Sequence, residues 1–143
     1  MTYLLDTNVV SEWIRPQPNP NLVAWLEEVD EDRLHISVAT FAEIRHGIER
    51  MTPGRRRQAL MRWLDEELAD RFADRILPID RTVAESWGVL MARASASGSS
   101  MATMDGFLAA TAATHNLTLV TRDAADFRGA GVPTLNPWEG AES

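Results

Sequence analysis

The chain alternates short apolar runs with longer segments of helical periodicity, and this alternation restricts its fold more than any other feature. Four apolar runs have the length of buried strands: 3–5, 33–37, 75–79 and 117–120. Helical spacing of apolar residues covers 9–14, 22–29, 38–51, 55–72, 81–94 and 105–115, and a short extended segment spans 132–138. Strands separated by helices indicate a parallel sheet covered on both faces, so we expect the α/β class.

The chain is expected to form a single domain over 1–143. Its 143 residues fall within the usual size of one domain, and 45% of them are hydrophobic. The sequence contains no internal repeat and no linker that would divide it. The small polar stretch 95–100 has the weakest pattern.

Composition excludes several kinds of chemistry. The chain has no cysteine, which removes disulfides, thiolate metal sites and thiol catalysis. All 14 basic residues are arginines, so neither a Schiff base nor a P-loop lysine is available. The net charge of −7 argues against a broad basic face for nucleic acid. A few local arginines and a cation could still hold such a substrate.

We expect the protein to be cytoplasmic and not bound to a membrane. No apolar run reaches the length that a membrane-spanning helix needs. The first residues lack the basic start and long apolar stretch of a secretion signal.

Four carboxylates lie close to the places where predicted strands end. Asp6 directly follows the first strand, Glu43 lies in the helix after the second, Asp105 begins the helix before the fourth, and Asp123 follows that fourth strand. Ligands of parallel sheets bind beyond the carboxyl ends of the strands. Carboxylates gathered there repel one another, so they either have a raised pKa or bind a cation, for which oxygen ligands suit Mg²⁺ or Mn²⁺. Such a site suits hydrolysis of a phosphodiester bond.

Each of these acids also has a purely structural interpretation. Asp6 and Asp105 are both good helix N-caps. Thr40 and Glu43 have the spacing of a capping box, and Asp123 fits a polar turn. Spacing alone leaves both interpretations open, position by position.

Four motifs in order extend the argument. They are Leu-Leu-Asp6-Thr7-Asn8-Val-Val-Ser-Glu, Ala-Glu43-Ile-Arg-His-Gly, Met-Asp105-Gly-Phe-Leu-Ala-Ala-Thr-Ala and Val-Thr121-Arg122-Asp123-Ala-Ala-Asp126-Phe. Together they resemble a PIN domain, and specifically the VapC toxins of bacterial toxin–antitoxin pairs, including the FitB-like branch. The closing Leu-Asn136-Pro137-Trp138 resembles that branch as well. The likeness extends from Asp6 to Trp138.

The resemblance implies an α/β/α sandwich around a mainly parallel sheet and a Mg²⁺- or Mn²⁺-dependent endoribonuclease. By motif position, the catalytic and metal-binding acids are Asp6, Glu43, Asp105 and Asp123. Asn8 and Thr121 match positions that orient these carboxylates. Asp126 is an additional acid beside them. The family often has Asn where this chain has Asp123.

The resemblance also implies particular partners. These are an RNA substrate and a small VapB-like antitoxin that lays a basic side chain among the acids, which an acidic cleft would attract. It implies homodimers, assembled as a dimer of dimers in the antitoxin complex. DNA would be bound only through the antitoxin.

Other features have more ordinary interpretations. Arg55, Arg56, Arg57 and Arg62 form the main basic cluster, which we interpret as a solvated helix face rather than an RNA contact. Four tryptophans fall on apolar helix faces and are predicted to pack in the core or between protomers: Trp13, Trp25, Trp63 and Trp87. We also weigh a non-enzymatic function, in which a PIN-like fold serves only as a protein-binding module. Phosphatase and receiver-domain alternatives would need a lysine that the chain lacks.

Overall fold

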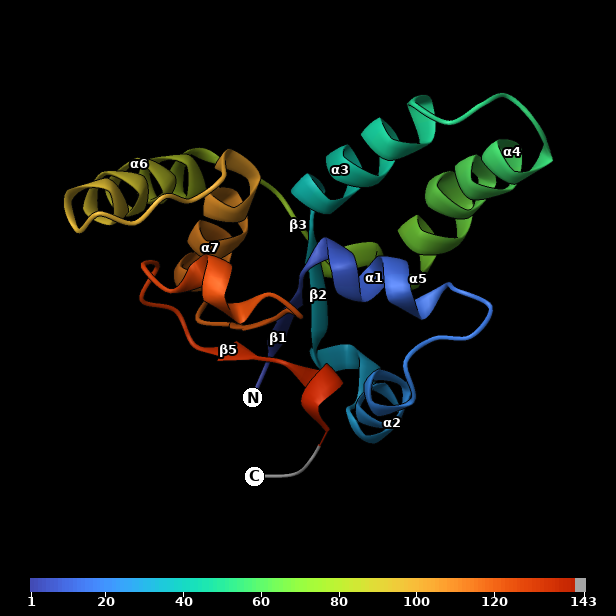
Figure 1. Ribbon diagram of the computed structural model, residues 1–143, viewed down its shortest axis with the longest axis horizontal. Coiled ribbons are helices and arrows are strands. Elements are labelled where there is room, and N and C mark those ends of the chain that lie inside the picture. Colours follow the sequence, from blue (N-terminus) through green and yellow to red (C-terminus); the bar gives the residue numbers. More distant parts are fainter. Residues whose placement is uncertain (141–143) are drawn as a thin grey trace.

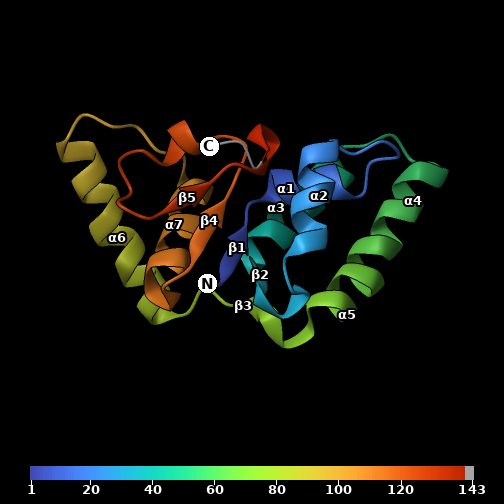
Figure 2. The same cartoon turned by 90° about the horizontal axis from the view of Figure 1, so that it is seen from below.

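The computed structural model describes residues 1–140 and contains a five-stranded sheet with helices on both faces (Figures 1 and 2). The strands are β1 (Tyr3–Leu5), β2 (Leu34–Ser37), β3 (Ile76–Leu77), β4 (Thr118–Val120) and β5 (Thr134–Leu135). Their order is β3-β2-β1-β4-β5, and every neighbouring pair is parallel. The predicted α/β class with a parallel sheet is therefore confirmed.

Helices occupy most of the remaining chain. The α-helices are α1 (Thr7–Trp13), α2 (Pro20–Glu28), α3 (Val38–Glu49), α4 (Arg55–Arg62), α5 (Ala69–Phe72), α6 (Arg81–Ala96) and α7 (Thr103–His115). The other helical segments are the π-helix η2 (Trp63–Leu68) and the 3-10 turns η1 (Glu31–Arg33), η3 (Ala73–Arg75), η4 (Ala124–Phe127) and η5 (Pro137–Glu139). Among the described residues, no helix is long and apolar enough to cross a membrane.

The two faces of the sheet bury separate apolar clusters because successive strand residues point in opposite directions. Leu5 joins the cluster under α1, α2 and the α4–α5 region, whereas its neighbour Leu4 joins the cluster under α7. Figure 2 shows α6 and α7 on one side of the sheet and α4 and α5 on the other. Burial on both faces explains why the strands read as continuous apolar runs.

Three predicted elements differ from the observed ones by more than a shift of their ends. The single helix expected over 55–72 is interrupted by a π-helical segment, η2. The strands expected at 75–79 and 132–138 shorten to the two-residue strands β3 and β5. Apolar spacing does not distinguish α from π hydrogen bonding, and each of these strands pairs with only one neighbouring strand, at an edge of the sheet.

Glu12 fixes the connection between α1 and α2 from a buried position. Its Oε2 accepts a hydrogen bond from the Asn19 backbone N–H at 2.8 Å, and Asn19 in turn caps α2. The ion pair of Glu12 with Arg15, at 3.3 Å, involves an exposed guanidinium and contributes little.

Replacing Glu12 with Ala should lower the free energy of unfolding by roughly 1–3 kcal/mol, because the Asn19 N–H loses its acceptor. Glu12→Gln retains a carbonyl oxygen there and should cost less. Urea denaturation of the three proteins measures both differences. Equal stability of wild type and Glu12→Ala would contradict this account of the connection.

Candidate active site

The carboxyl ends of β1 and β4 bring Asp6 and Thr121 together at the centre of the sheet. These strands are adjacent, and the Asp6 N–H donates to the Val120 carbonyl at 2.9 Å. Thr121 is fully buried, and its hydroxyl donates to Asp6 Oδ2 at 2.7 Å. The other carboxylate oxygen, Oδ1, accepts from the Thr7 backbone N–H at 2.6 Å, where Asp6 caps α1. Asp6 is therefore an N-cap and a member of the acidic site at once.

Glu43 reaches the same edge from α3, which follows β2. Its Oε1 accepts a hydrogen bond from the Thr7 hydroxyl at 2.6 Å. The Thr7 oxygen also lies 3.2 Å from that of the buried Thr40. The predicted capping box of Thr40 and Glu43 is wrong, because α3 begins earlier and Ser37 caps it through the Ala39 N–H. Glu43 is thereby free to face the end of β1.

Asp105 lies in the first turn of α7 and is half-buried. The prediction that it caps this helix is wrong, since α7 begins at Thr103 and Ala102 occupies the cap position. A carboxylate in the first turn still faces the positive end of the helix dipole. The close contact of Gly106 with Trp87 and Met91 of α6 leaves no room for a Cβ there, and this packing sets the position of the turn.

Asp123 lies beyond β4 and is held by Asn8. The Asn8 amide donates to Asp123 Oδ2 at 3.1 Å, and the Asp123 N–H donates to Thr121 Oγ1 at 3.0 Å. Asp123 is about half exposed, so it faces solvent at the rim of the group. Asp126 follows in η4 and is also exposed.

The carboxylates share one electrostatic environment. Burial raises the pKa of Asp6 to about 6, and the charges of Asp105 and Glu43 add to that rise against the hydrogen bonds from Thr121 and Thr7. The pKa of Asp105 is also raised, first by burial and then by the charges of Asp126, Glu43 and Asp123. The charges of all five predicted acids therefore interact at this edge of the sheet: Asp6, Glu43, Asp105, Asp123 and Asp126.

A hard cation fits the chemistry of this group, because carboxylate and hydroxyl oxygens surround charges that repel one another. Within residues 1–140, however, no three of the His, Asp and Glu side chains are already arranged as a metal-binding group. The acids lie near one another but do not converge on one point. The carboxylates of Asp6 and Glu43 instead accept hydrogen bonds from neighbouring hydroxyl groups.

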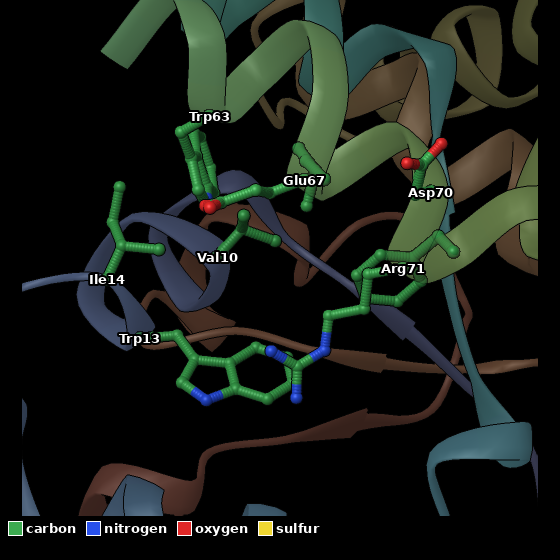
Figure 3. Close-up of a pocket in the computed structure, with 9 residues that line it drawn as sticks. Val10, Trp13, Ile14, Trp63, Glu67, Asp70 and Arg71 are labelled. Atoms are coloured by element: carbon green, nitrogen blue, oxygen red, sulfur yellow. The ribbon is translucent and has the colours of Figure 1, made fainter. Parts of the chain in front are cut away.

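One hollow on the α1 side of the molecule adjoins the acids, and another on that side lies apart from them. A groove of about 520 Å³ between α1, α3 and α4 includes Glu43 and is lined mainly by apolar side chains such as Ile44, Leu60 and Trp63. The second, of about 580 Å³, lies between α1 and the η2–α5 region (Figure 3). There Arg71 lies 4.1 Å over the Trp13 ring and pairs with Glu31, an arrangement that holds helices together.

Asn8 and Thr121, which were expected to orient the acids, contact Asp123 and Asp6, but two further residues were not expected to take part. Thr7 was part of a quoted motif but had no assigned role, and it is the hydroxyl that binds Glu43. Asn136 donates to the Arg122 carbonyl at 3.2 Å, which ties the end of the chain to the loop that carries Asp123. The parallel pairing of β4 with β5 creates this contact between residues 14 positions apart.

Comparison with known proteins agrees with this architecture. The model of the PIN domain family matches residues 3–132. Toxin FitB of Neisseria gonorrhoeae is 42% identical over 94% of this chain and 97% of its own length, and VapC ribonuclease Y4jK of Sinorhizobium fredii is 38% identical over 96% and 99%. The structure of FitAcB from N. gonorrhoeae superposes with a TM-score of 0.89 at 41% identity, covering 96% of this chain and 99% of that one. The chain therefore belongs to the PIN domain family, among the relatives of FitB and VapC.

Proposed function

We propose that this protein is the toxin of a type II toxin–antitoxin pair and acts as a Mg²⁺- or Mn²⁺-dependent endoribonuclease. The observation that carries the proposal is the buried Asp6, surrounded by other acids, with its pKa raised to about 6. Buried carboxylates with raised pKa values in a cluster are typical of functional sites. The relative Y4jK is named a ribonuclease, and FitB a toxin.

In this proposal Asp6, Glu43, Asp105 and Asp123 hold the cation. A divalent ion held by these carboxylates would supply Lewis-acid chemistry for hydrolysis of a phosphodiester bond. Thr121 and Thr7 hold the Asp6 and Glu43 carboxylates in place, and Asn8 holds that of Asp123. Asp126 adds negative charge beside Asp105.

We further propose that a VapB-like antitoxin covers this site. The apolar groove between α1, α3 and α4 would receive an amphipathic segment, and its opening beside Glu43 would bring a basic side chain to the acids. Solved structures of related proteins include FitAB bound to a DNA fragment, 39% identical with a TM-score of 0.89. By analogy, this chain would form homodimers, assemble as a dimer of dimers with its antitoxin, and meet DNA only through that partner.

The decisive experiment incubates purified protein with total bacterial RNA in Mg²⁺ or Mn²⁺, with EDTA in parallel. Discrete fragments that disappear with EDTA are expected. Asp32→Asn is the matched control for Asp6→Asn and Asp105→Asn, the variants expected to lose cleavage. Asp32 is an exposed acid in η1, at the opposite end of β2 from the site. If the folded wild-type protein cleaves no RNA and is not toxic on induced expression, the alternative of a protein-binding module would be favoured.

Replacing Thr121 with Val should reduce cleavage by about 10–100-fold, the usual effect of losing a group that orients a ligand. The Thr121 hydroxyl lowers the pKa of Asp6, so its loss should also move the rising limb of the pH–rate profile to higher pH. Thr121→Ser retains the hydroxyl and should preserve activity. Initial rates across pH for the three proteins test both effects, and a fully active Thr121→Val would contradict the role of this hydrogen bond.

A further inference from the structure

The loop that carries Asp123 also carries Arg122, whose backbone is fixed on both sides. Its N–H faces Asn8 Oδ1 at 3.5 Å, and its carbonyl accepts from Asn136 Nδ2 at 3.2 Å. Neither contact uses the Arg122 side chain. The backbone is thus anchored to α1 and to the C-terminal segment whatever the guanidinium does.

The guanidinium of Arg122 lies against a fixed aromatic surface. Its Cζ is 5.7 Å from the centre of the Trp138 ring, within the range of a cation–π contact. Trp138 is held through its N–H, which donates to Asn136, and through its carbonyl, which accepts from Asn21 of α2 at 2.8 Å. The ring also packs against the apolar cluster under α2. The arginine therefore lies against the ring of a residue that is hydrogen-bonded and packed onto the body of the fold.

The donors of Arg122 are only loosely engaged. The side chain is half exposed, and its Nε lies 3.8 Å from Asp123 Oδ1, too far for a hydrogen bond. No hydrogen bond to its guanidinium is found among residues 1–140. A planar cation that lies over an aromatic ring keeps its N–H groups available at the edge, in the geometry that suits two phosphate oxygens.

Resting on the proposed ribonuclease function, we infer that Arg122 binds a phosphate group of the RNA strand on the Asp123 side of the acidic group. The Asn136–Trp138 segment is the device that positions it. A chain with a net charge of −7 repels RNA, and its acids repel the phosphate most strongly at the site itself. One guanidinium that Trp138 holds beside those acids offsets that repulsion and sets the register of the strand.

The test measures kcat, KM and salt dependence on a short single-stranded RNA that spans a cleavage point mapped in total RNA. Arg122→Ala should raise KM about tenfold, the effect of losing a charge-assisted hydrogen bond, and leave kcat within a factor of about three. The negative slope of log(kcat/KM) against log[KCl] should become shallower by about 0.7, the value for one phosphate contact on a single strand.

Four further variants separate charge from structure. Arg122→Lys should restore the salt slope but not the full affinity, because an ammonium lacks the planar fork. Trp138→Leu should raise KM while keeping the wild-type salt slope, since the arginine cation remains. Trp138→Phe keeps an aromatic ring, so its KM should lie between those of wild type and Trp138→Leu. Arg55→Ala removes the same charge from an exposed position at the start of α4, and should change activity less than tenfold with no change in slope.

If Arg122→Ala matches Arg55→Ala in both KM and slope while wild type cleaves, the inference is wrong and the ribonuclease function stands. If Arg122→Ala unfolds at a much lower temperature and Arg122→Lys does not restore the slope, the residue is structural. If wild type neither cleaves nor binds RNA, the proposed function and this inference fail together.

Discussion

Replacing Asp6 with Asn should abolish RNA cleavage and, without metal at neutral pH, raise the melting temperature. The substitution removes the negative charge at the centre of the acidic group, so the proposed cation site would lose its most buried carboxylate. The same charge is unfavourable for folding, because burial and the neighbouring acids raise its pKa from 3.8 to about 6. A gain in stability with loss of function is expected where a functional site holds like charges close together.

The sign of the pH dependence follows from that shift. A carboxyl whose pKa is higher in the folded than in the unfolded state binds protons more tightly when folded. Wild type therefore loses stability as pH rises from about 4 through about 6, by at most about 3 kcal/mol for this shift of two units. Asn does not titrate, so the advantage of the variant should be largest above pH 7 and vanish near pH 4.

The hydrogen bonds of Asp6 decide how much of this gain is realised. Asn retains one carbonyl oxygen for the Thr7 N–H, and its amide can donate to Thr121 Oγ1 in place of the present acceptor. Thermal denaturation in EDTA across pH measures the result, with Asp32→Asn as the matched control. A melting-temperature difference that is independent of pH would contradict the raised pKa, and full cleavage by Asp6→Asn would contradict the proposed role.

The central part of the site could be predicted from the sequence because it depends on local pattern. An apolar run that ends at Asp6, and another that ends at Thr121, place both residues at carboxyl ends of strands whenever the sheet is parallel. The pairing of β1 with β4 then follows from the fold class, and the contact between the two side chains follows from the pairing.

The orientation of Glu43 and Asp123 could not be predicted in this way. Glu43 meets Thr7 across 36 residues, where α1 and α3 approach each other, and local capping signals suggested a different partner. Asp123 depends on Asn8, which is 115 residues away. Such contacts arise from how the helices pack on the sheet, and the spacing of residues along the chain does not predict that packing.

Replacing Asp105 should affect both RNA cleavage and the response of the melting temperature to metal. Asp105→Asn should abolish cleavage and remove most of the rise in melting temperature that Mg²⁺ or Mn²⁺ produces in wild type. Unlike Asp6, this carboxyl accepts no hydrogen bond found in residues 1–140, and burial together with Asp126, Glu43 and Asp123 raises its pKa. A cation that neutralises these charges stabilises the folded state in proportion to its binding, so its effect is visible without any RNA.

Protons and the cation should compete for these carboxyls. Because the pKa values of Asp6 and Asp105 are both raised, the metal-induced rise in melting temperature should shrink as pH falls through about 6, and more metal should recover it. Differential scanning fluorimetry with increasing MnCl₂ at several pH values measures this. Asp32→Asn should respond as wild type does. A metal response that Asp105→Asn retains in full would place the ion elsewhere, whereas loss of both response and cleavage would tie binding and catalysis to one cluster of acids.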